Sequence, residues 1–353
     1  MDSANVDPAL EAWGVSDADY PKDGDAEGRL RFLLRYAILA PSGHNTQPWL
    51  FAVDDGAIEV YADRARALPV VDPDDRELTI SCGAALETLC IAMRHFGHRG
   101  AVRLAPDPGD EDLLARVTLG EGDPSSRDEE ELFRGIPRRH SNRQAFEARD
   151  VPGALADRLV ADAEVHGAWL CLVRGEDRAA VADLVAEGDR VQMADKRFRR
   201  ELAAWVHPNR SRSRDGMRGY GFGFGNLMSH GGPLAIRAFD LGKGQAAKDR
   251  ELAQGSPLLA VLGTAADDPA SWLSSGRALQ RVLLRARTSD VWSSYLNQPI
   301  EVEALRPRLA ETIGKPGQFP QLIMRLGYGA EVKPQPRRPV EAVIVDAEAG
   351  GRQ

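Results

Sequence analysis

Apolar residues recur along the chain with two spacings, and these predict both helices and strands. Spacings of three and four residues, which place apolar side chains on one face, predict helices over 29–39, 78–96, 154–164, 272–287 and 302–313. Short runs rich in β-branched, leucine and aromatic residues predict strands over 49–53, 58–62, 101–104, 115–119, 168–173, 257–263 and 342–345. Because Asp54-Asp55-Gly56 separates the first two strands, we expect them to form a hairpin. The mixture predicts an α+β fold.

Composition along the chain predicts its division into parts. Residues 1–28, rich in Asp, Ala and Pro, are expected to form a loosely ordered arm, and 347–353 a tail. At 353 residues the chain exceeds most single cores, so we predict a first half over 29–128 and a second half over 129–346. Two charged helical segments, at 177–187 and 195–206, lie in the second half.

The two halves share a sequence pattern. The aligned positions are Trp49 with Trp169, Gly83 with Gly276, and Leu86 with Leu279. The distance from the strand to the glycine-containing helix is longer in the second half, so that half carries an insertion. We interpret the pattern as an internal duplication; chance similarity between amphipathic helices is the alternative.

The bend after the first predicted helix carries small and amide side chains. It reads Ala40-Pro-Ser-Gly-His-Asn-Thr-Gln-Pro-Trp-Leu50, and Pro41 and Gly43 end the helix. Such a bend can bring Ser42, Asn45 and backbone N–H groups against a flat polar ring. An ordinary helix-to-strand loop is the alternative, which residue types alone favour.

A basic run lies where the two halves join. It reads Arg138-Arg-His-Ser-Asn-Arg-Gln-Ala-Phe146, so several cationic and hydroxyl side chains lie close together. These groups suit a phosphate, which accepts bidentate hydrogen bonds from arginine. The alternative is a solvated basic run without a ligand.

Both motifs resemble segments of nitroreductase-family flavoproteins. Ala-Pro-Ser-x-x-Asn-x-Gln-Pro-Trp, at 40–49, is similar to the family's stretch after the first helix, and residues 139–143 resemble its Arg-x-Ser-x-Arg signature. The resemblance implies that the bend lies against the isoalloxazine ring of FMN, through Pro41, Ser42, Gly43 and Asn45. It implies that the signature binds the phosphate and ribityl chain of FMN, through Arg139, His140, Ser141 and Arg143.

The C-terminal part extends the resemblance. Residues 319–329, followed by Arg337-Arg338-Pro339, are similar to the family's ending, in which an arginine before the last strand meets the phosphate. Which of the two arginines makes this contact stays open, and without the resemblance they are surface charge. The family also places backbone near the pyrimidine side of the flavin where Asn297 and Gln298 stand here.

The distribution of the motifs resembles one branch of the family. Ordinary nitroreductases carry both motifs in each chain, and two chains build two sites. Here the bend occurs in the first half only and the arginine signature in the second half only. Together with Asp74-x-Arg76-Glu77, this resembles the Acg-like branch from actinobacteria over residues 29–345. It implies two fused nitroreductase-like units, each an antiparallel or mixed sheet flanked by helices, forming an intrachain pseudo-dimer that is a monomer with one FMN site.

The insertion holds a segment, 208–232, that is rich in arginine, serine and glycine. It includes Gly219-Tyr-Gly-Phe-Gly-Phe-Gly225, and alternating glycines and aromatics let a loop move while its rings stack on a ligand. A glycine-rich packing loop is the alternative. In the Acg-like branch an inserted segment covers the flavin as a lid.

Composition and charge narrow the classes of function. The formal charge of −8 argues against a nucleic-acid binder, because phosphate contacts need a basic surface. No apolar run approaches membrane-spanning length and the acidic N-terminus lacks a signal-peptide pattern, so we expect a cytoplasmic location. Cys82 and Cys90 are expected to be buried thiols, without a metal site. No Ser-His-Asp, Cys-His or paired-carboxylate pattern predicts a catalytic side chain.

Three functions follow from these observations. The first is an FMN-dependent oxidoreductase, which passes hydride from NAD(P)H through N5 of FMN to a nitro, quinone or enone-type small-molecule acceptor. The second is a lidded flavin-binding protein that sequesters FMN with little or no turnover. The third is a flavin-free scaffold. The sequence specifies neither the acceptor nor NADH over NADPH.

Overall fold

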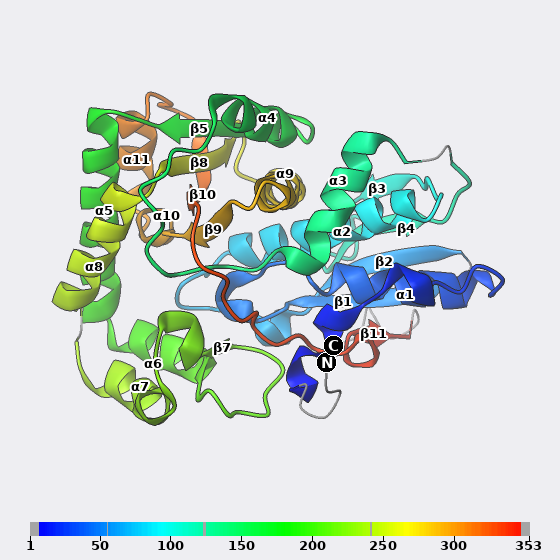
Figure 1. The fold of residues 1–353 in the computed structure, drawn as a ribbon, viewed down its shortest axis with the longest axis horizontal. Coiled ribbons are helices and arrows are strands. Elements are labelled where there is room, and N and C mark those ends of the chain that lie inside the picture. Colours follow the sequence, from blue (N-terminus) through cyan, green and yellow to red (C-terminus); the bar gives the residue numbers. More distant parts are fainter. Residues whose placement is uncertain (1–6, 55, 123–124, 241, 347–353) are drawn as a thin grey trace.

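The computed structural model describes residues 7–54, 56–122, 125–240 and 242–346 (Figure 1). The predicted tail, the first six residues of the predicted arm and Asp55 of the predicted hairpin turn lie outside these ranges. Among the described residues, no helix is both long and apolar enough to cross a membrane.

The first half is an antiparallel sheet with helices on it. Its elements are α1 (Ala26–Ala37), β1 (Trp49–Asp54), β2 (Ala57–Ala62), α2 (Arg76–His95), β3 (Val102–Leu104), β4 (Leu113–Thr118) and α3 (Arg127–Gly135). The strands stand in the order β1-β2-β4-β3 with every neighbouring pair antiparallel. The hairpin expected from Asp54-Asp55-Gly56 is formed by β1 and β2. The sequence pattern does not predict the helix α3, because its residues fall at the end of a strongly charged stretch and in the connection between the two halves.

The second half repeats the series of a helix, two strands, a central helix and two strands, with two short helices, α10 (Gln298–Glu301) and α11 (Arg306–Thr312), between its last two strands. Its other elements are α4 (Gly153–Glu164), β5 (Trp169–Val173), β8 (Leu258–Thr264), α9 (Pro269–Thr288), β9 (Trp292–Tyr295) and β10 (Phe319–Gly327). The sheet order is β5-β8-β10-β9, again antiparallel throughout. Each strand therefore has a counterpart at the same position of the first sheet, which supports the duplication. The prediction of an α+β fold with helix-flanked sheets is confirmed.

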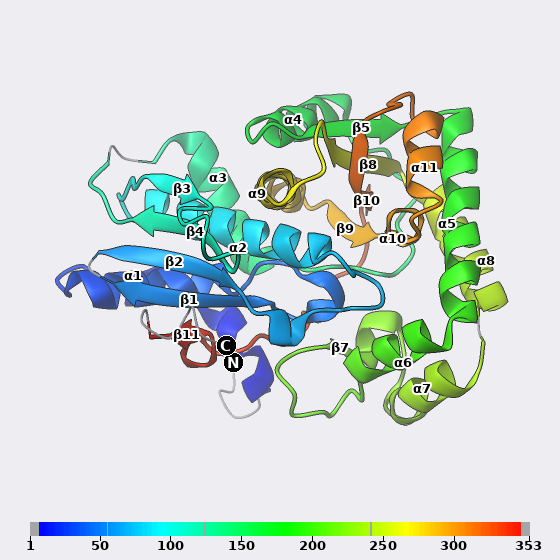
Figure 2. The same cartoon turned by 180° about the vertical axis from the view of Figure 1, so that it is seen from behind.

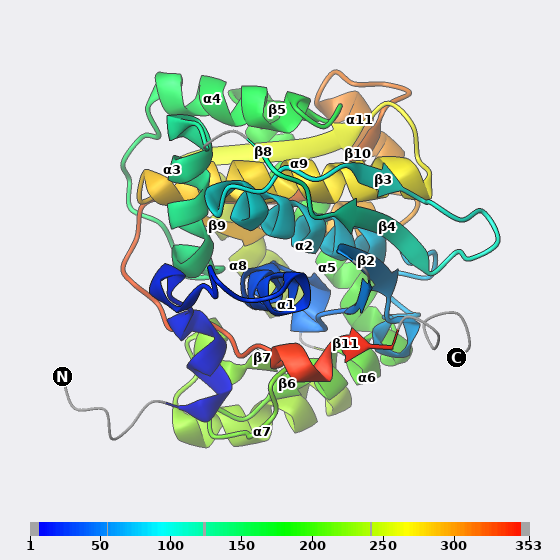
Figure 3. The ribbon, with the colours of Figure 1, turned by 90° about the vertical axis from the view of Figure 1, so that its right-hand side faces the viewer.

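The two aligned helices, α2 and α9, pack against each other between the sheets (Figures 1 and 3). A Cβ atom placed on Gly83 would lie 2.2 Å from the Leu273 carbonyl oxygen, and one on Gly276 would lie 1.9 Å from that of Ile80. Each glycine thus contacts the residue three positions before its counterpart, as a two-fold relation between the helices requires. The absence of side chains at these two positions sets how closely the halves approach.

The insertion lies between β5 and β8, at the place that the short β1–β2 hairpin turn occupies in the first half. It comprises α5 (Glu176–Ala194), α6 (Lys196–Trp205), β6 (Val206–His207), β7 (Met217–Arg218), α7 (Asn226–Ala238) and α8 (Gly242–Gly255). The helices α5 and α8 lie side by side, and α6 packs on α7 (Figures 1 and 2). The sequence pattern predicts neither α7 nor α8. The helix α7 begins inside 208–232, for which a loop is expected. Glycines and Pro233 disfavour a helix there, and packing on α6 overrides that preference.

The chain ends by returning to the first half. After β10 it runs across the molecule, and β11 (Ile344–Val345) pairs in parallel with β1, so Phe51 is opposite Ile344. This gives the first sheet a fifth strand. Val343, fully buried, joins the hydrophobic core of the first half.

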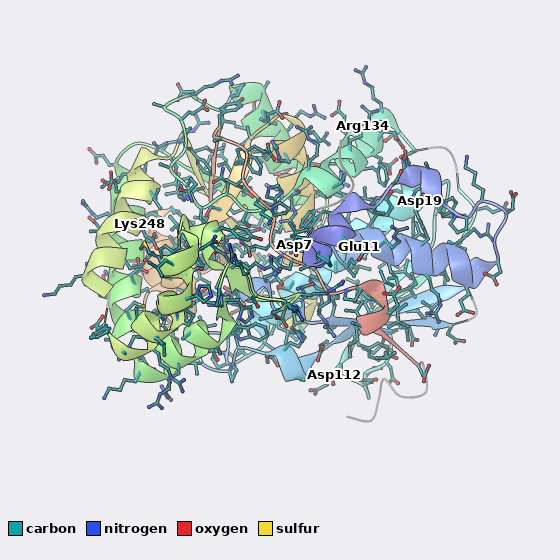
Figure 4. All side chains as sticks on the ribbon, turned by 60° about the horizontal axis from the view of Figure 1, so that its bottom comes forward. Asp7, Glu11, Asp19, Asp112, Arg134 and Lys248 are labelled. Carbon is teal, nitrogen blue, oxygen red and sulfur yellow. The ribbon has the colours of Figure 1, made fainter. Side chains whose placement is uncertain are left out.

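The described part of the N-terminal arm is ordered, contrary to the sequence-based expectation. Two short 3-10 helices, Pro8–Gly14 and Asp17–Asp19, precede α1. Trp13 donates its indole N–H to the Gln335 carbonyl at 2.9 Å, and Asp7, labelled in Figure 4, pairs with Arg218 of the insertion. The interpretation as a loose arm was wrong because these partners are distant in sequence.

Candidate functional site

A cavity of about 380 Å³ lies where the two halves and the insertion meet. Its volume is in the range of small-molecule sites. Eleven of the twelve predicted site residues line it, and these are Pro41, Ser42, Gly43, Asn45, Arg139, His140, Ser141, Arg143, Asn297, Gln298 and Arg337. The bend of the first half and the arginine signature therefore face one space, although about a hundred residues separate them in the chain.

The bend after α1 adopts a backbone that few residues favour. His44, Asn45 and Gln47 all have positive φ, of 47°, 57° and 54°. The Ser42 hydroxyl accepts a hydrogen bond from the Gln47 backbone N–H at 2.9 Å, which closes the turn. The Gln47 side chain donates to the Arg214 carbonyl of the insertion at 2.9 Å. The strained turn is thus held from inside and from the insertion.

Asn45 holds this bend to two distant segments. Its amide group donates to the carbonyls of Gly216, at 2.9 Å, and Pro336, at 3.1 Å, while its oxygen accepts from Arg337 at 2.8 Å. With these bonds made, the side chain positions the bend, the insertion and the C-terminal segment together.

Two buried arginines converge on one backbone carbonyl at the end of α1. Arg139, 2% exposed, donates to the Leu39 carbonyl at 2.6 Å, and Arg337, 4% exposed, donates to the same oxygen at 3.3 Å. Burial lowers the pKa of Arg139 to about 10, and burial together with the neighbouring Arg139 charge holds the pKa of Arg337 well below its usual value. Among the described residues, neither guanidinium pairs with a carboxylate within 4.0 Å. Their charge is compensated by carbonyl dipoles and, for Arg337, by the Trp13 ring, whose centre lies 4.8 Å from the guanidinium.

Arg143 joins the cavity wall to segment 208–232. Its guanidinium lies 3.4 Å from the Met217 sulfur and 5.1 Å from the centre of the Phe222 ring. It also has no carboxylate partner among the described residues. Met217, Phe222 and Phe224 line the cavity, and the two phenylalanine rings stack at 5.9 Å.

Two histidines in the cavity wall are held neutral. His140 donates from Nε2 to the Val332 carbonyl at 2.7 Å, and its buried Nδ1 has no partner within the described ranges. Burial lowers the pKa of His140 to about 4, and burial with the Arg143 charge does the same for His44. His44 was not among the predicted site residues, because the family motif leaves its position unspecified.

The structure separates the two C-terminal arginines. Arg337 lines the cavity, whereas Arg338 bonds to the Gln47 carbonyl at 3.1 Å and to Asp63 at 3.2 Å, outside it. Arg338 is therefore the one predicted site residue that does not reach the cavity.

Asn297 and Gln298 line another part of the cavity wall. Asn297 donates to Glu77 at 3.1 Å and accepts from the Ile323 N–H at 3.0 Å. Gln298 donates to Asp189 of α5 at 3.1 Å and to Asp249 of α8 at 3.0 Å. Four carboxylates line this part of the cavity. Glu77 belongs to the Asp74-x-Arg76-Glu77 motif, whereas no short spacing in the sequence points to Asp189, Asp249 or Glu301.

These features fit a ligand with an anionic group and a flat polar body. Three buried polar atoms have no hydrogen-bond partner among the residues that the structure describes: the Nε atoms of Arg139 and Arg337 and the hydroxyl of Tyr295. Uncompensated guanidiniums suit a phosphate, and the bend supplies backbone and hydroxyl groups beside them. FMN has this combination of a phosphate and a flat ring.

Comparison with known proteins gives the family. No protein-family model matches the chain. The chain is 30% identical over 325 residues to the Mycobacterium tuberculosis (strain H37Rv) protein named "Putative NAD(P)H nitroreductase Rv3131", covering 91% of this chain and 92% of the relative. It is 25% identical over 324 residues to "Putative NAD(P)H nitroreductase acg" of the same strain, covering 89% of this chain and 95% of that relative.

Two solved structures are similar to part of this chain. One is the FMN and NADPH-dependent nitroreductase NfnB from sphigopyxis sp. strain HMH, with a TM-score of 0.41, 20% identity, and coverage of 61% of this chain and 97% of that chain. Another is a nitroreductase with bound FMN from Desulfitobacterium hafniense DCB-2, with a TM-score of 0.37, 15% identity, and coverage of 61% and 97%. On the identity to Rv3131 across nearly its whole length, the protein belongs to the NAD(P)H nitroreductase family that includes Rv3131 and acg.

Proposed function

We propose that this protein binds one FMN in the described cavity and uses NAD(P)H to reduce a nitro, quinone or enone-type small molecule. Arg139, Arg143 and Arg337 would bind the phosphate, with His140 and Ser141 beside the ribityl chain. The bend at Pro41, Ser42 and Gly43 would lie against the ring. Bound FMN supplies the redox chemistry by accepting and donating hydride at N5, so no catalytic side chain is required.

The observation that carries this proposal is a set of arginines that face one cavity and have no carboxylate partner among the described residues. Arg139 and Arg337 are buried and Arg143 is half-buried. Burying an unpaired guanidinium is costly, and these three are stabilised when an anion binds in the cavity they share. A phosphate accepts several charge-assisted hydrogen bonds at once. A flavin-free scaffold has no equivalent use for this charge.

The test uses purified protein and two variants. We expect yellow protein with an FMN absorption spectrum, and we expect the double variant R139A/R143A to lose FMN. Each charge-assisted hydrogen bond contributes about 1.5–3 kcal/mol, so the affinity should fall by at least about a hundredfold. The control is R138A, whose guanidinium is 46% exposed and pairs with Asp290. Full flavin occupancy in the double variant would contradict the phosphate assignment.

Segment 208–232 favours a second function, in which the protein sequesters FMN. Met217, Phe222 and Phe224 line the cavity, and the Gly216 N–H donates to the Asn45 carbonyl at 3.2 Å, which ties the segment to the bend. A lid held this way could exclude a second substrate. Anaerobic stopped-flow absorbance distinguishes the two functions. Bleaching of the flavin by NADH or NADPH supports the oxidoreductase, whereas reduction by dithionite alone supports sequestration.

We also propose that the chain is a pseudo-dimer that works as a monomer. The matching strand orders and the reciprocal contacts of Gly83 and Gly276 support this arrangement. In it, residues 29–128 and 129–346 are the two units, and one chain completes one site. The cytoplasmic location stays a prediction.

A further inference from the structure

The cavity wall formed by α5, α8 and α10, its acidic end, carries several carboxylates. Asp189 on α5 and Asp249 on α8 are 4% and 7% exposed, and both accept a hydrogen bond from the Gln298 amide. Glu301, at the end of α10, accepts one from Gln192 at 2.5 Å. Both α5 and α8 belong to the insertion, so this acidic end has no counterpart in the first half.

Hydrogen-bond acceptors at this end lack donors. The Asp189 Oδ2 atom and the Gln298 Oε1 atom are buried, and neither has a hydrogen-bond partner in the part of the chain that the structure describes. Amide groups are the only side-chain donors to Asp189 and Asp249, because neither forms an ion pair within 4.0 Å among the described residues. Buried acceptors without donors are costly, so this end is suited to a ligand that brings N–H groups and positive charge.

We propose that this acidic end, centred on Asp189, Asp249 and Gln298, binds the cationic nitrogen group of the acceptor molecule, as a protonated amine, an amidinium or a guanidinium. The inference rests on the proposed function only in taking the ligand to be the electron acceptor. The protein would then be selective for small molecules that combine a reducible group with a basic nitrogen. Arg139, Arg143 and Arg337, which line the same cavity, would repel this cation and fix its orientation.

The acid pair makes this binding depend on pH. Burial and the nearby Asp249 carboxylate raise the pKa of Asp189 to about 8, and burial raises that of Asp249. The surrounding charges are Arg190 on α5, Lys248 on α8 (Figure 4), Arg325 on β10, and Glu301 and Glu77. Without a bound cation, the pair of Asp189 and Asp249 therefore keeps a proton at pH 7. A bound cation favours the loss of that proton. We expect cation binding to release a proton at pH 7 and to strengthen as the pH rises through 8.

The test compares two probes of nearly the same shape, the cation 4-nitrobenzamidine and the neutral 4-nitrobenzamide. Isothermal titration calorimetry of the protein as purified should show about tenfold tighter binding of the cation, since one hydrogen bond to a charged group contributes about 1.5–3 kcal/mol. D189N should lose this preference. D183N is the control, because Asp183 lies on the same helix with 60% of its side chain exposed. Buffers of different ionisation enthalpy report the released proton.

Equal binding of the two probes by the wild-type protein, or an unchanged preference in D189N, would overturn the proposal. Should D189N fail to fold, D249N takes its place with the same expectation. The flavin spectrum of each sample is recorded separately. Absence of FMN would contradict the proposed function, whereas the probe preference tests the acidic end without any turnover.

Discussion

His140 shows how burial fixes the charge of a single side chain in this cavity. Its Nε2–H donates to the Val332 carbonyl, and the ring contacts those of Trp13 and Trp292 edge-on at 5.8 and 4.9 Å. Burial, together with the charges of Arg139, Arg287 and Arg337, lowers its pKa to about 4. At the pH at which an ordinary histidine begins to take up a proton, this imidazole is therefore still neutral.

This lowered pKa makes a prediction about stability in acid. Between pH 6.5 and about 4 the unfolded chain binds a proton at this histidine and the folded protein does not, so stability falls as the pH falls. The full effect of one such group is about 3 kcal/mol. Urea unfolding at pH 7 and pH 4 should show a smaller loss in H140Q than in the wild type. Equal losses would show that the histidine is protonated in the folded protein.

The helix pair α2 and α9 shows how two elements depend on missing side chains. The carbonyl oxygens of Ile80 and Leu273 occupy the space where Cβ atoms of Gly276 and Gly83 would lie. Since backbone cannot move aside as a flexible side chain can, a methyl group here would push the two halves apart.

We therefore expect G276A to destabilise the protein by about 3 kcal/mol, the upper part of the range for overpacked cores. G244A, in α8, is the matched control, because a Cβ there has nothing within 4 Å. That change should be neutral or stabilise the helix by about 0.5–1 kcal/mol. Denaturant unfolding of the two variants measures the difference, and equal stabilities would disprove the close crossing.

Most elements could be predicted from sequence where the apolar spacing is regular. The helices at 78–96 and 272–287 and the hairpin at 49–62 agree with α2, α9, β1 and β2 to within a few residues. The insertion was harder, since Gly231-Gly232-Pro233 indicates a loop but lies within α7. The apolar spacing does not predict the strand β10, which only the family resemblance covers. Its residues are buried on both faces and include Gln321 and Arg325, so apolar and polar positions do not alternate along it.

At the scale of the whole molecule, residues distant in sequence make the cavity. The family motifs led to Arg139, Arg143 and Arg337 because each motif is local. The acidic end could not be found this way, since Asp189, Asp249 and Glu301 come from three helices that only the fold brings together. Likewise, only the fold shows that Arg337, and not Arg338, lines the cavity.

The same long-range contacts predict the mass in solution. The helix α2 already packs on α9 of its own chain, and β1 already pairs with β11. Light scattering after size-exclusion chromatography should therefore give about the chain mass of 38.4 kDa. Unfolding followed by tryptophan fluorescence and by circular dichroism should coincide, because the halves share these contacts. A mass near twice this value would refute the monomer.

The pairing of β1 with β11 also bears on biosynthesis. The ribosome makes Phe51 long before Ile344, the residue opposite it in the finished sheet. At translation rates of about 5–20 residues per second, β1 waits roughly 15 to 60 s with one edge open. An open strand edge can pair with another nascent chain, so polysomes are where this protein is most exposed to aggregation, and slower elongation would lengthen that interval.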